Sequence, residues 1–348
     1  PEDLSNVPAE LAEDEYVGQL RELLSSESLF RGTLAETRKL QEELLYPYLE
    51  FFLRHDYHGY YHRLFRNRGL TDNRDSLRSD IVLEDLARLR IHSDDLRGAG
   101  QRERLIAELQ PGSNTGAGAP PGGIVGRSSA GLTFVSSGTT AGTEGPVRLF
   151  RSKLRLDLSR HANAALIDWA LKRRVEGGEA LMHMAPEMTD FTTFAAIGAD
   201  VFRHRGSSVR FGAKLKEGPA DSSAWQRLTP DSSELRRFFK SQVDPKYLIS
   251  TGGGLYRMLV EPEGTRRMGM KMTLGVPPIY LGDSGVLMIG GGLKRLPGRY
   301  NSLSQLLTEL GESIKAGWTK DAAPAPVIDM LGLTESLTVF MGVPMDPG

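Results

Sequence analysis

The sequence predicts an α/β protein in which packed, mostly parallel sheets are flanked by helices and follow a helical N-terminal segment. Leucines recur at three-and-four spacing in the first hundred residues, which is typical of amphipathic helices. After residue 130, short apolar runs of strand length alternate with longer helical stretches. Strands interleaved with helices favour a largely parallel sheet whose carboxyl strand ends carry the functional site.

The composition excludes several classes of protein. The chain has 348 residues, enough for about two subdomains, and its 43 Lys and Arg balance 44 Asp and Glu. The balanced charge gives no overall positive potential that would indicate nucleic acid as a partner. The absence of cysteine excludes disulfides, zinc–cysteine sites and a thiol nucleophile in this segment. No signal peptide and no apolar run of transmembrane length is found, so we expect no membrane span and a cytoplasmic location.

Residues 1–110 are expected to form the helical segment, with the clearest periodicity from Leu40 to Leu53. His58 and His62 are four residues apart, but no third ligand accompanies them, so a tyrosine-rich packing face is preferred to a metal site. Residues 111–131 are rich in Gly, Pro, Ala and Ser, which predicts an exposed loop.

Residues 132–348 are expected to form the α/β region. A helix is predicted over residues 153–175, and a polar surface loop over residues 217–233. The predicted strands are Gly131–Val135, Ala180–Met184, Tyr247–Ser250, Val286–Ile289 and Val327–Leu331.

The first strand of this region runs into a loop rich in glycine and hydroxyl residues, Ser136 to Gly145. Glycines let a backbone approach an anion closely, and free N–H groups and short hydroxyls can donate hydrogen bonds to it. The loop is not a Walker loop, because no lysine follows its glycines. A polyphosphate loop is favoured, and an ordinary Ser/Gly turn is the alternative.

Two further glycine-containing motifs follow later strands. Gly290-Gly-Gly-Leu-Lys294 comes after Val286–Ile289, and Gly332-Leu-Thr-Glu-Ser336 comes after Val327–Leu331. Taken singly, the first of these could be a tight turn and the second a helix cap. Such separate explanations are harder to accept for three motifs together than for one.

In order and spacing the three motifs resemble those of the adenylate-forming superfamily, which includes the acyl-CoA synthetases. The Gly290–Lys294 segment is most similar to the luminescence acyl-protein synthetases, and Asp80–Arg97 resembles the entry segment of that branch and of the phenylacetate-CoA ligases. The resemblance covers residues 40–345 approximately. It departs from the family pattern where Ala141 precedes Gly142, where two extra residues precede Pro146, and where Arg148 and Leu331 replace a common lysine and an aromatic residue.

The resemblance implies that the site binds ATP and Mg²⁺. Thr334 would donate to the α-phosphate, Glu335 would hold Mg²⁺, and Arg148 would assist the departing pyrophosphate. The other residues implied in the nucleotide pocket are Ser136, Ser137, Gly138, Thr139, Thr140 and Gly142 in the first motif, Gly290, Gly291, Gly292, Leu293 and Lys294 in the second, and Leu331, Gly332 and Leu333 in the third.

The resemblance also implies a pocket for a carboxylic acid substrate. Phe191 would take the place of the aromatic residue or histidine that borders the carboxylate, and Asp190 would recognise an amine if the acid carries one. Gly252 and Gly253 would leave room for the acyl group.

The implied activity is formation of an acyl-adenylate with release of pyrophosphate, followed by transfer to a thiol or amine. The acceptor would be a protein, a carrier protein or CoA, and a CoA ligase of the phenylacetate type is the nearest alternative. The family's mobile C-terminal lid domain, with its lysine, is not found after Ser336. A nucleotide-binding regulatory or scaffold subunit without full catalysis is therefore a second alternative.

Overall fold

Contacts within the computed structural model divide the chain into two units, Pro1–His161 and Ala162–Gly348, and each unit is described by itself. The structure describes residues 14–25, 33–54, 60–72, 76–89, 126–128, 131–135, 148–190, 192–217, 227–256, 258, 279–291, 296, 298, 300–311, 313–333 and 338–342. Among these residues, no helix is both long and apolar enough to cross a membrane.

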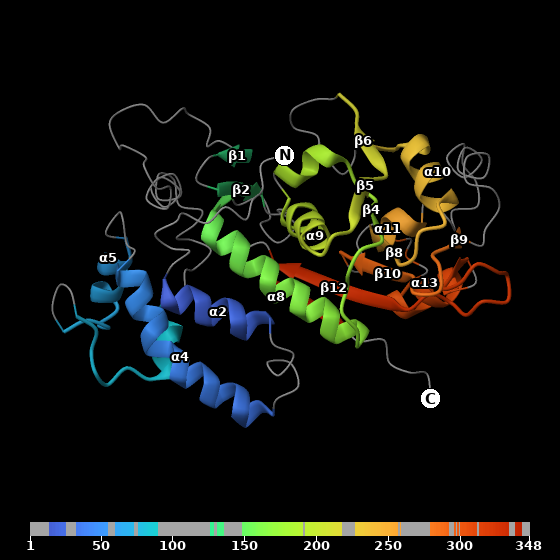
Figure 1. Ribbon diagram of the computed structural model, residues 1–348. Helices are drawn as coiled ribbons and strands as arrows, with labels where there is room; N and C mark the ends of the chain where they lie inside the picture. Colours follow the sequence, from blue (N-terminus) through green and yellow to red (C-terminus); the bar gives the residue numbers. More distant parts are fainter. Residues whose placement is uncertain are drawn as a thin grey trace. The chain divides into compact units, whose positions relative to one another are not determined.

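The first unit begins with the predicted amphipathic helices (Figure 1). A capping box starts the longest of them, because Thr33 Oγ1 accepts from the backbone N–H of Glu36 while Glu36 Oε2 accepts from the backbone N–H of Thr33. Leu45, Leu49 and Leu53 of this helix are buried together, as their three-and-four spacing predicts. The elements are α2 (Glu15–Ser25), α4 (Leu34–Arg54), α5 (Tyr60–Asn67) and the 3₁₀ helix η1 (Leu83–Leu89).

A three-stranded antiparallel sheet follows these helices in the first unit. It consists of β1 (Gly126–Ser128), β2 (Gly131–Val135) and β3 (Arg148–Ser152) in that order. The predicted strand Gly131–Val135 is confirmed as β2, and β3 leads directly into α8 (Lys153–Leu171), the predicted helix after the loop.

The second unit contains a six-stranded sheet in which five strands are parallel, so an α/β fold with a mostly parallel sheet is confirmed. The order is β13-β12-β10-β8-β4-β5, and β13 alone runs antiparallel. β12 is the long red arrow in Figure 1. The strands are β4 (Glu179–Met182), β5 (Ser208–Phe211), β8 (Lys246–Thr251), β10 (Val286–Gly290), β12 (Val327–Leu333) and β13 (Thr338–Gly342).

Alternate residues of these strands pack against different helices. Leu181 and Leu248 face a core shared with α10 (Ser232–Lys240) and α13 (Leu303–Gly311). Met182 and Tyr247 face the other way, toward α9 (Thr193–His204), where Met182 lies against Gly198 and the rings of Tyr247 and Phe202 are 4.9 Å apart. Helices therefore cover both faces, which requires the continuous apolar strands seen in the sequence.

Two short strand pairs lie outside the main sheet. β6 (Ala213–Leu215) pairs with β7 (Leu228–Pro230), and β9 (Ile279–Tyr280) pairs with β11 (Ile314–Lys315). The prediction of a continuous loop over residues 217–233 is therefore wrong at its C-terminal end, which contains β7 and the start of α10. Asp231 caps α10 by accepting from the backbone N–H groups of Ser233 and Glu234, so the polar composition there reflects a helix start.

Candidate active site at the carboxyl edge of the sheet

The order of the parallel strands reverses between β4 and β8. From β4 the chain first adds β5 on one side, and then adds β8, β10 and β12 on the other. All five strands end at the same edge because they are parallel. Open parallel sheets bind ligands at this edge, outside the point where the order reverses. The candidate site is therefore centred on the ends of β4 and β8.

A histidine and a serine meet at that point. His183 Nδ1 lies 2.9 Å from Ser250 Oγ. The backbone N–H of His183 donates to the carbonyl of Ile249 at 2.8 Å, which continues the pairing of Met182 with Ile249 one step beyond β4. His183 and Ser250 each follow a core leucine by two residues, so the period of a strand places both on the same face.

Gly254 packs directly on this pair. A Cβ atom on Gly254 would lie 3.0 Å from Ser250 Oγ, 3.0 Å from Thr251 Oγ1 and 3.1 Å from His183 Nδ1. Thr251 is the N-cap of α11 (Gly252–Leu255), and its hydroxyl accepts from the backbone N–H of Gly254 at 3.1 Å. A Cβ at position 254 would therefore press on the histidine and the serine, which glycine avoids.

The environment keeps the imidazole neutral. Burial lowers the pKa of His183 from 6.5 to about 4, because desolvation disfavours the protonated ring. Ser250 is itself fully buried. A neutral imidazole held by one nitrogen can bind a ligand through the other.

The second glycine motif begins at the end of β10, beside this pair. Gly290 is the direct partner of Thr251 in the register of β10 and β8. A Cβ on Gly290 would lie 2.8 Å from the ring of Phe194, so the glycine makes room for α9. Gly291 has a φ of 87°, a conformation that favours glycine, and a Cβ placed on it would lie 3.8 Å from the methyl group of Thr251. Gly292, Leu293 and Lys294 lie outside the described residues.

The third motif belongs to the adjacent strand. Gly290 pairs with Met330, so Leu331, Gly332 and Leu333 continue β12 beyond the end of β10. The prediction that the strand ends at Leu331 is wrong, because Gly332 and Leu333 pair with Val339 and Thr338 of β13. Thr334 and Glu335 lie outside the described residues.

The first motif belongs to the first unit. Val135, the last residue of β2, pairs with Arg148, the first residue of β3, so the pairing of the two strands brings the ends of the intervening segment together. Arg148 directly follows that segment in the sequence. The predicted phosphate-binding residues Ser136, Ser137, Gly138, Thr139, Thr140 and Gly142 lie outside the described residues.

The predicted acid-pocket residues are placed in part. Asp190 is the last residue of the 3₁₀ helix η3 (Pro186–Asp190), between β4 and α9, and is partly exposed. Gly252 and Gly253 are buried in α11, directly after β8. Both connections leave the edge of the sheet where the order reverses. Phe191 lies outside the described residues.

His183 and Ser250 were not among the residues that the sequence patterns predicted for the site. The available signal was a histidine that interrupts the apolar run Ala180–Met184 at a strand end. The position of Ser250 beside it depends on the pairing of β4 with β8, which no local pattern reveals.

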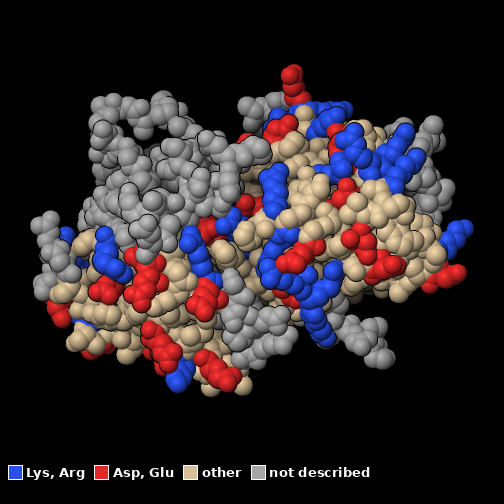
Figure 2. All heavy atoms as spheres, in the orientation of Figure 1, with Lys and Arg blue, Asp and Glu red and all other residues tan. Residues whose placement is uncertain are grey.

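Charged side chains of both signs occur on the described part of the surface in Figure 2, with basic side chains gathered over α10 and β6. Lys214 of this group pairs with Asp231, and Arg237 pairs with Glu234. Part of its charge is therefore neutralised within the fold. In the described part of the chain, no three His, Asp or Glu side chains gather as metal ligands do.

The chain was also compared with known proteins. No protein-family model matches it, and the search of curated proteins returned no relative.

Proposed function

We propose that the protein is an ATP-dependent ligase that activates a carboxylic acid as its acyl-adenylate and passes the acyl group to a thiol or amine. The observation that supports this most strongly is the register of β10 with β12. Gly290, which starts the second motif, pairs with Met330, and the third motif begins two residues after Met330, at Gly332. The two motifs, residues 290–294 and 332–336, thus leave adjacent strands at the carboxyl edge of the sheet, where open parallel sheets bind ligands.

The division of the edge between two ligands also supports the proposal. The nucleotide motifs leave β10 and β12, whereas the acid-pocket residues Asp190, Gly252 and Gly253 follow β4 and β8. Activation of an acid requires its carboxylate beside the α-phosphate of ATP, and neighbouring strand ends provide adjacent binding positions.

The residues available fit ATP and Mg²⁺ by their chemistry. Mg²⁺ prefers carboxylate oxygen, which Glu335 would supply, and the metal would stabilise the negative charge of the phosphates. Thr334 would donate to the α-phosphate, and the hydroxyl and N–H groups of Ser136–Thr140 would hold the phosphates that leave as pyrophosphate. The side of Gly290 that faces α9 is filled by Phe194, so we assign contact with adenine to the later part of that motif.

We further propose that the α/β region is the large N-terminal domain of the adenylate-forming fold. The parallel order and the antiparallel β13 that follows the third motif are compatible with this domain. The acyl acceptor would be a protein thiol, a carrier protein or CoA.

The deciding experiment is ATP–pyrophosphate exchange with Mg²⁺ over a panel of fatty, aromatic and amino acids, each assayed beside an acid-free control. Exchange that depends on one class of acid would establish the ligase and its substrate class. Hydrolysis of ATP that is indifferent to the acid would reject the proposal. Nucleotide binding without exchange would also reject it, in favour of a regulatory subunit.

A further inference from the structure

Exposed basic side chains gather on one face of the second unit, over α10 and β6 (Figure 2). On α10 the two buried residues Leu235 and Phe238 face the core, and the cations lie on the solvent side. The whole chain has a formal net charge of −1, so this concentration of positive charge is local. The basic face consists of the exposed residues Lys214, Lys216, Arg236, Arg237 and Lys240.

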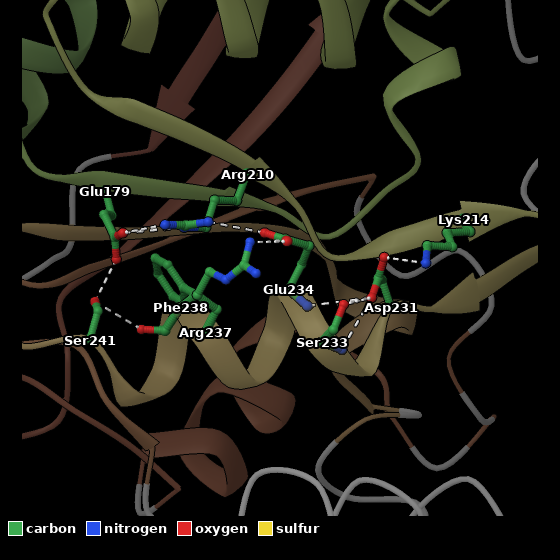
Figure 3. Close-up of polar contacts among 9 residues, drawn as sticks. All are labelled: Glu179, Arg210, Lys214, Asp231, Ser233, Glu234, Arg237, Phe238 and Ser241. Carbon is green, nitrogen blue, oxygen red and sulfur yellow. Dashed lines mark hydrogen bonds and ion pairs between the residues drawn. The ribbon is translucent and has the colours of Figure 1, made fainter.

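The carboxylates closest to the basic face are held by contacts within the fold. Arg210 Nη1 donates to Glu234 Oε2 at 3.1 Å, and Arg237 donates to the other oxygen of the same carboxylate (Figure 3). Asp231 caps α10 and also pairs with Lys214. The charges of Arg237 and Lys214 are therefore partly neutralised.

Two cations of the basic face keep their full charge. Among the described residues, neither Lys216 nor Lys240 forms an ion pair with a carboxylate. A cation in the last turn of a helix stabilises the helix dipole, which accounts for Lys240. Lys216 directly follows β6 and belongs to no helix, so the dipole does not account for the whole face.

The basic face begins at the carboxyl edge of the sheet. The backbone N–H of Gly212 donates to the carbonyl of Met182 at 2.8 Å, and that of Asp231 donates to the carbonyl of Gly212 at 2.9 Å. The start of α10 therefore lies beside the end of β4. β6 contacts η3, whose last residue is Asp190. A partner bound to this face would thus lie next to the segment assigned above to the acid.

The size and chemistry of the face favour a protein as its partner. Val243 is the single exposed large apolar residue in the described part of the second unit, so no apolar side chains accompany the cations for insertion into a membrane. Proteins that bind nucleic acid make about 6–10 phosphate contacts, more than the cations here provide. The nine residues of α10 span roughly 13 Å, a length that one helix of a partner protein can match.

We propose that the basic face binds an acidic protein that supplies the acyl acceptor, with carboxylates of the partner against α10 and β6. This inference rests on the ligase function proposed above. For a thiol acceptor, sulfur attacks the acyl carbonyl carbon, a carbon–sulfur bond forms, the bond to AMP breaks and the thiol proton passes to solvent. The basic face takes no part in this step and raises the rate of encounter between the two proteins.

Two synthetic helical peptides, each ending in one cysteine, serve as acceptor probes. One carries glutamate at every third and fourth position, and the other carries glutamine there. With an acid that supports exchange, we expect kcat/KM for thioester formation to be about tenfold higher for the glutamate peptide at low ionic strength. The difference should vanish at about 1 M salt, where the Debye length is about 3 Å. Equal values for the two peptides at low ionic strength would overturn the proposal.

Charge reversal locates the effect on the surface. Lys216→Glu combined with Lys240→Glu should abolish the preference for the glutamate peptide and leave ATP–pyrophosphate exchange unchanged. Lys172→Glu combined with Lys320→Glu is the matched control, because it changes the net charge equally at two exposed lysines outside the basic face. The control should keep the preference. An equal loss in the control would overturn the proposal, because net charge alone would then explain the effect.

Binding measured without ATP distinguishes failure of this inference from failure of the ligase function. Fluorescence anisotropy of the labelled glutamate peptide gives its affinity for the wild type and both double variants. If no acid supports exchange, the ligase function fails, and salt-dependent binding lost only in the Lys216/Lys240 variant would still support the docking surface. If exchange occurs but the glutamate peptide binds no better than the glutamine peptide, the ligase stands and the docking surface is rejected. Tighter binding of duplex DNA or of phosphatidylserine vesicles than of the glutamate peptide would also reject it.

Discussion

Glu179 and Lys246 are direct partners in the register of β4 and β8, and both are buried. Two ionisable residues therefore lie opposite each other at the amino edge of the sheet. Arg210 and the Ser241 hydroxyl both donate to the Glu179 carboxylate (Figure 3). Lys246 Nζ donates to the carbonyl of Ser241 at 2.6 Å and lies 5.0 Å from the ring of Trp318. The amino edge thus holds a polar network, and the carboxyl edge holds the candidate site.

Replacing Lys246 should change how stability depends on pH. Burial lowers the pKa of Lys246 from 10.5 to about 8, although Glu179 and Asp244 oppose the shift. Between pH 8 and 10.5 the unfolded chain keeps a proton that the folded chain has lost, so the wild type's free energy of unfolding rises with pH. In Lys246→Met this contribution, at most about 3 kcal/mol, is absent. Urea unfolding of both proteins across this range should give curves of different slope, and parallel curves would contradict the assignment.

Replacing Asp231 should weaken the start of α10. Its carboxylate pairs with Lys214 and accepts from the Ser233 hydroxyl and from the backbone N–H groups of Ser233 and Glu234 (Figure 3). These contacts, with Lys214 the largest contributor, lower its pKa from 3.8 to about 2. The stabilisation is present above pH 4 and is lost as the pH falls through 2. We expect Asp231→Ala to lower the free energy of unfolding by about 1–2 kcal/mol at pH 7. Asp231→Asn keeps a side-chain oxygen that can cap the helix, so it should lower the free energy of unfolding by less than Asp231→Ala does. An equal decrease for the two variants would mean that the charge of Asp231, and not its role as a cap, stabilises the protein.

Adding a methyl group at Gly254 should disturb the His183–Ser250 pair. Its Cβ would crowd three polar atoms at 3.0–3.1 Å, so Gly254→Ala should lower the free energy of unfolding by about 1–3 kcal/mol. Gly18→Ala is a matched control, because α2 leaves open space around Gly18. In the control, the free energy of unfolding should rise by about 0.5–1 kcal/mol, because alanine favours a helix more than glycine does. Urea denaturation measures the free energy of unfolding of both variants. An unchanged value for Gly254→Ala would show that His183 and Ser250 can shift to accommodate the added methyl group.

Removing the Glu335 carboxylate tests the proposed magnesium ligand. Glu335→Gln should abolish Mg²⁺-dependent exchange while leaving the unfolding transition unchanged, because the amide cannot supply a charged ligand oxygen. Glu176→Gln removes an exposed carboxylate that pairs with Arg174, and it should retain full exchange activity. Normal exchange activity of Glu335→Gln would show that Glu335 is not the magnesium ligand.

The hydroxyls of the first motif can be tested by comparing two nucleotides. Thr139→Ala combined with Thr140→Ala should weaken ATP binding far more than AMP binding, because only ATP carries the phosphates that these residues would hold. Isothermal titration calorimetry with each nucleotide gives the two affinities. Thr308→Ala, on the exposed face of α13, is the control and should change neither. An equal loss for ATP and AMP would contradict the assignment of the loop.

Apolar periodicity predicted most of the central strands, since β4, β8 and β10 are buried on both faces and, like β12, contain short apolar runs. It did not predict β5, in which Arg210 interrupts the run. That arginine is accommodated because Glu179 and Glu234, from other elements, both accept from its guanidinium. Such compensation is invisible to a local pattern.

The candidate site was predictable to a similar extent. Motifs that follow one strand directly, such as Gly290 and Gly291, can be read from the chain because the strand and its end are both local. The contact of His183 with Ser250 joins positions 67 residues apart and depends on strand pairing. The end of β12 was misplaced for the same reason, because Gly332 and Leu333 extend the strand only through their pairing with β13.

The first motif follows Val135, which pairs with Arg148, and the third motif extends past Leu333, which pairs with Thr338. In both places the paired strands hold the two ends of the intervening segment together, and the entropy of closing such a segment grows only slowly with its length: doubling the length costs about 0.6 kcal/mol. Insertions between such fixed ends therefore change the free energy of folding only slightly. The length of the chain between Val135 and Arg148 can therefore vary while β2 and β3 keep their register.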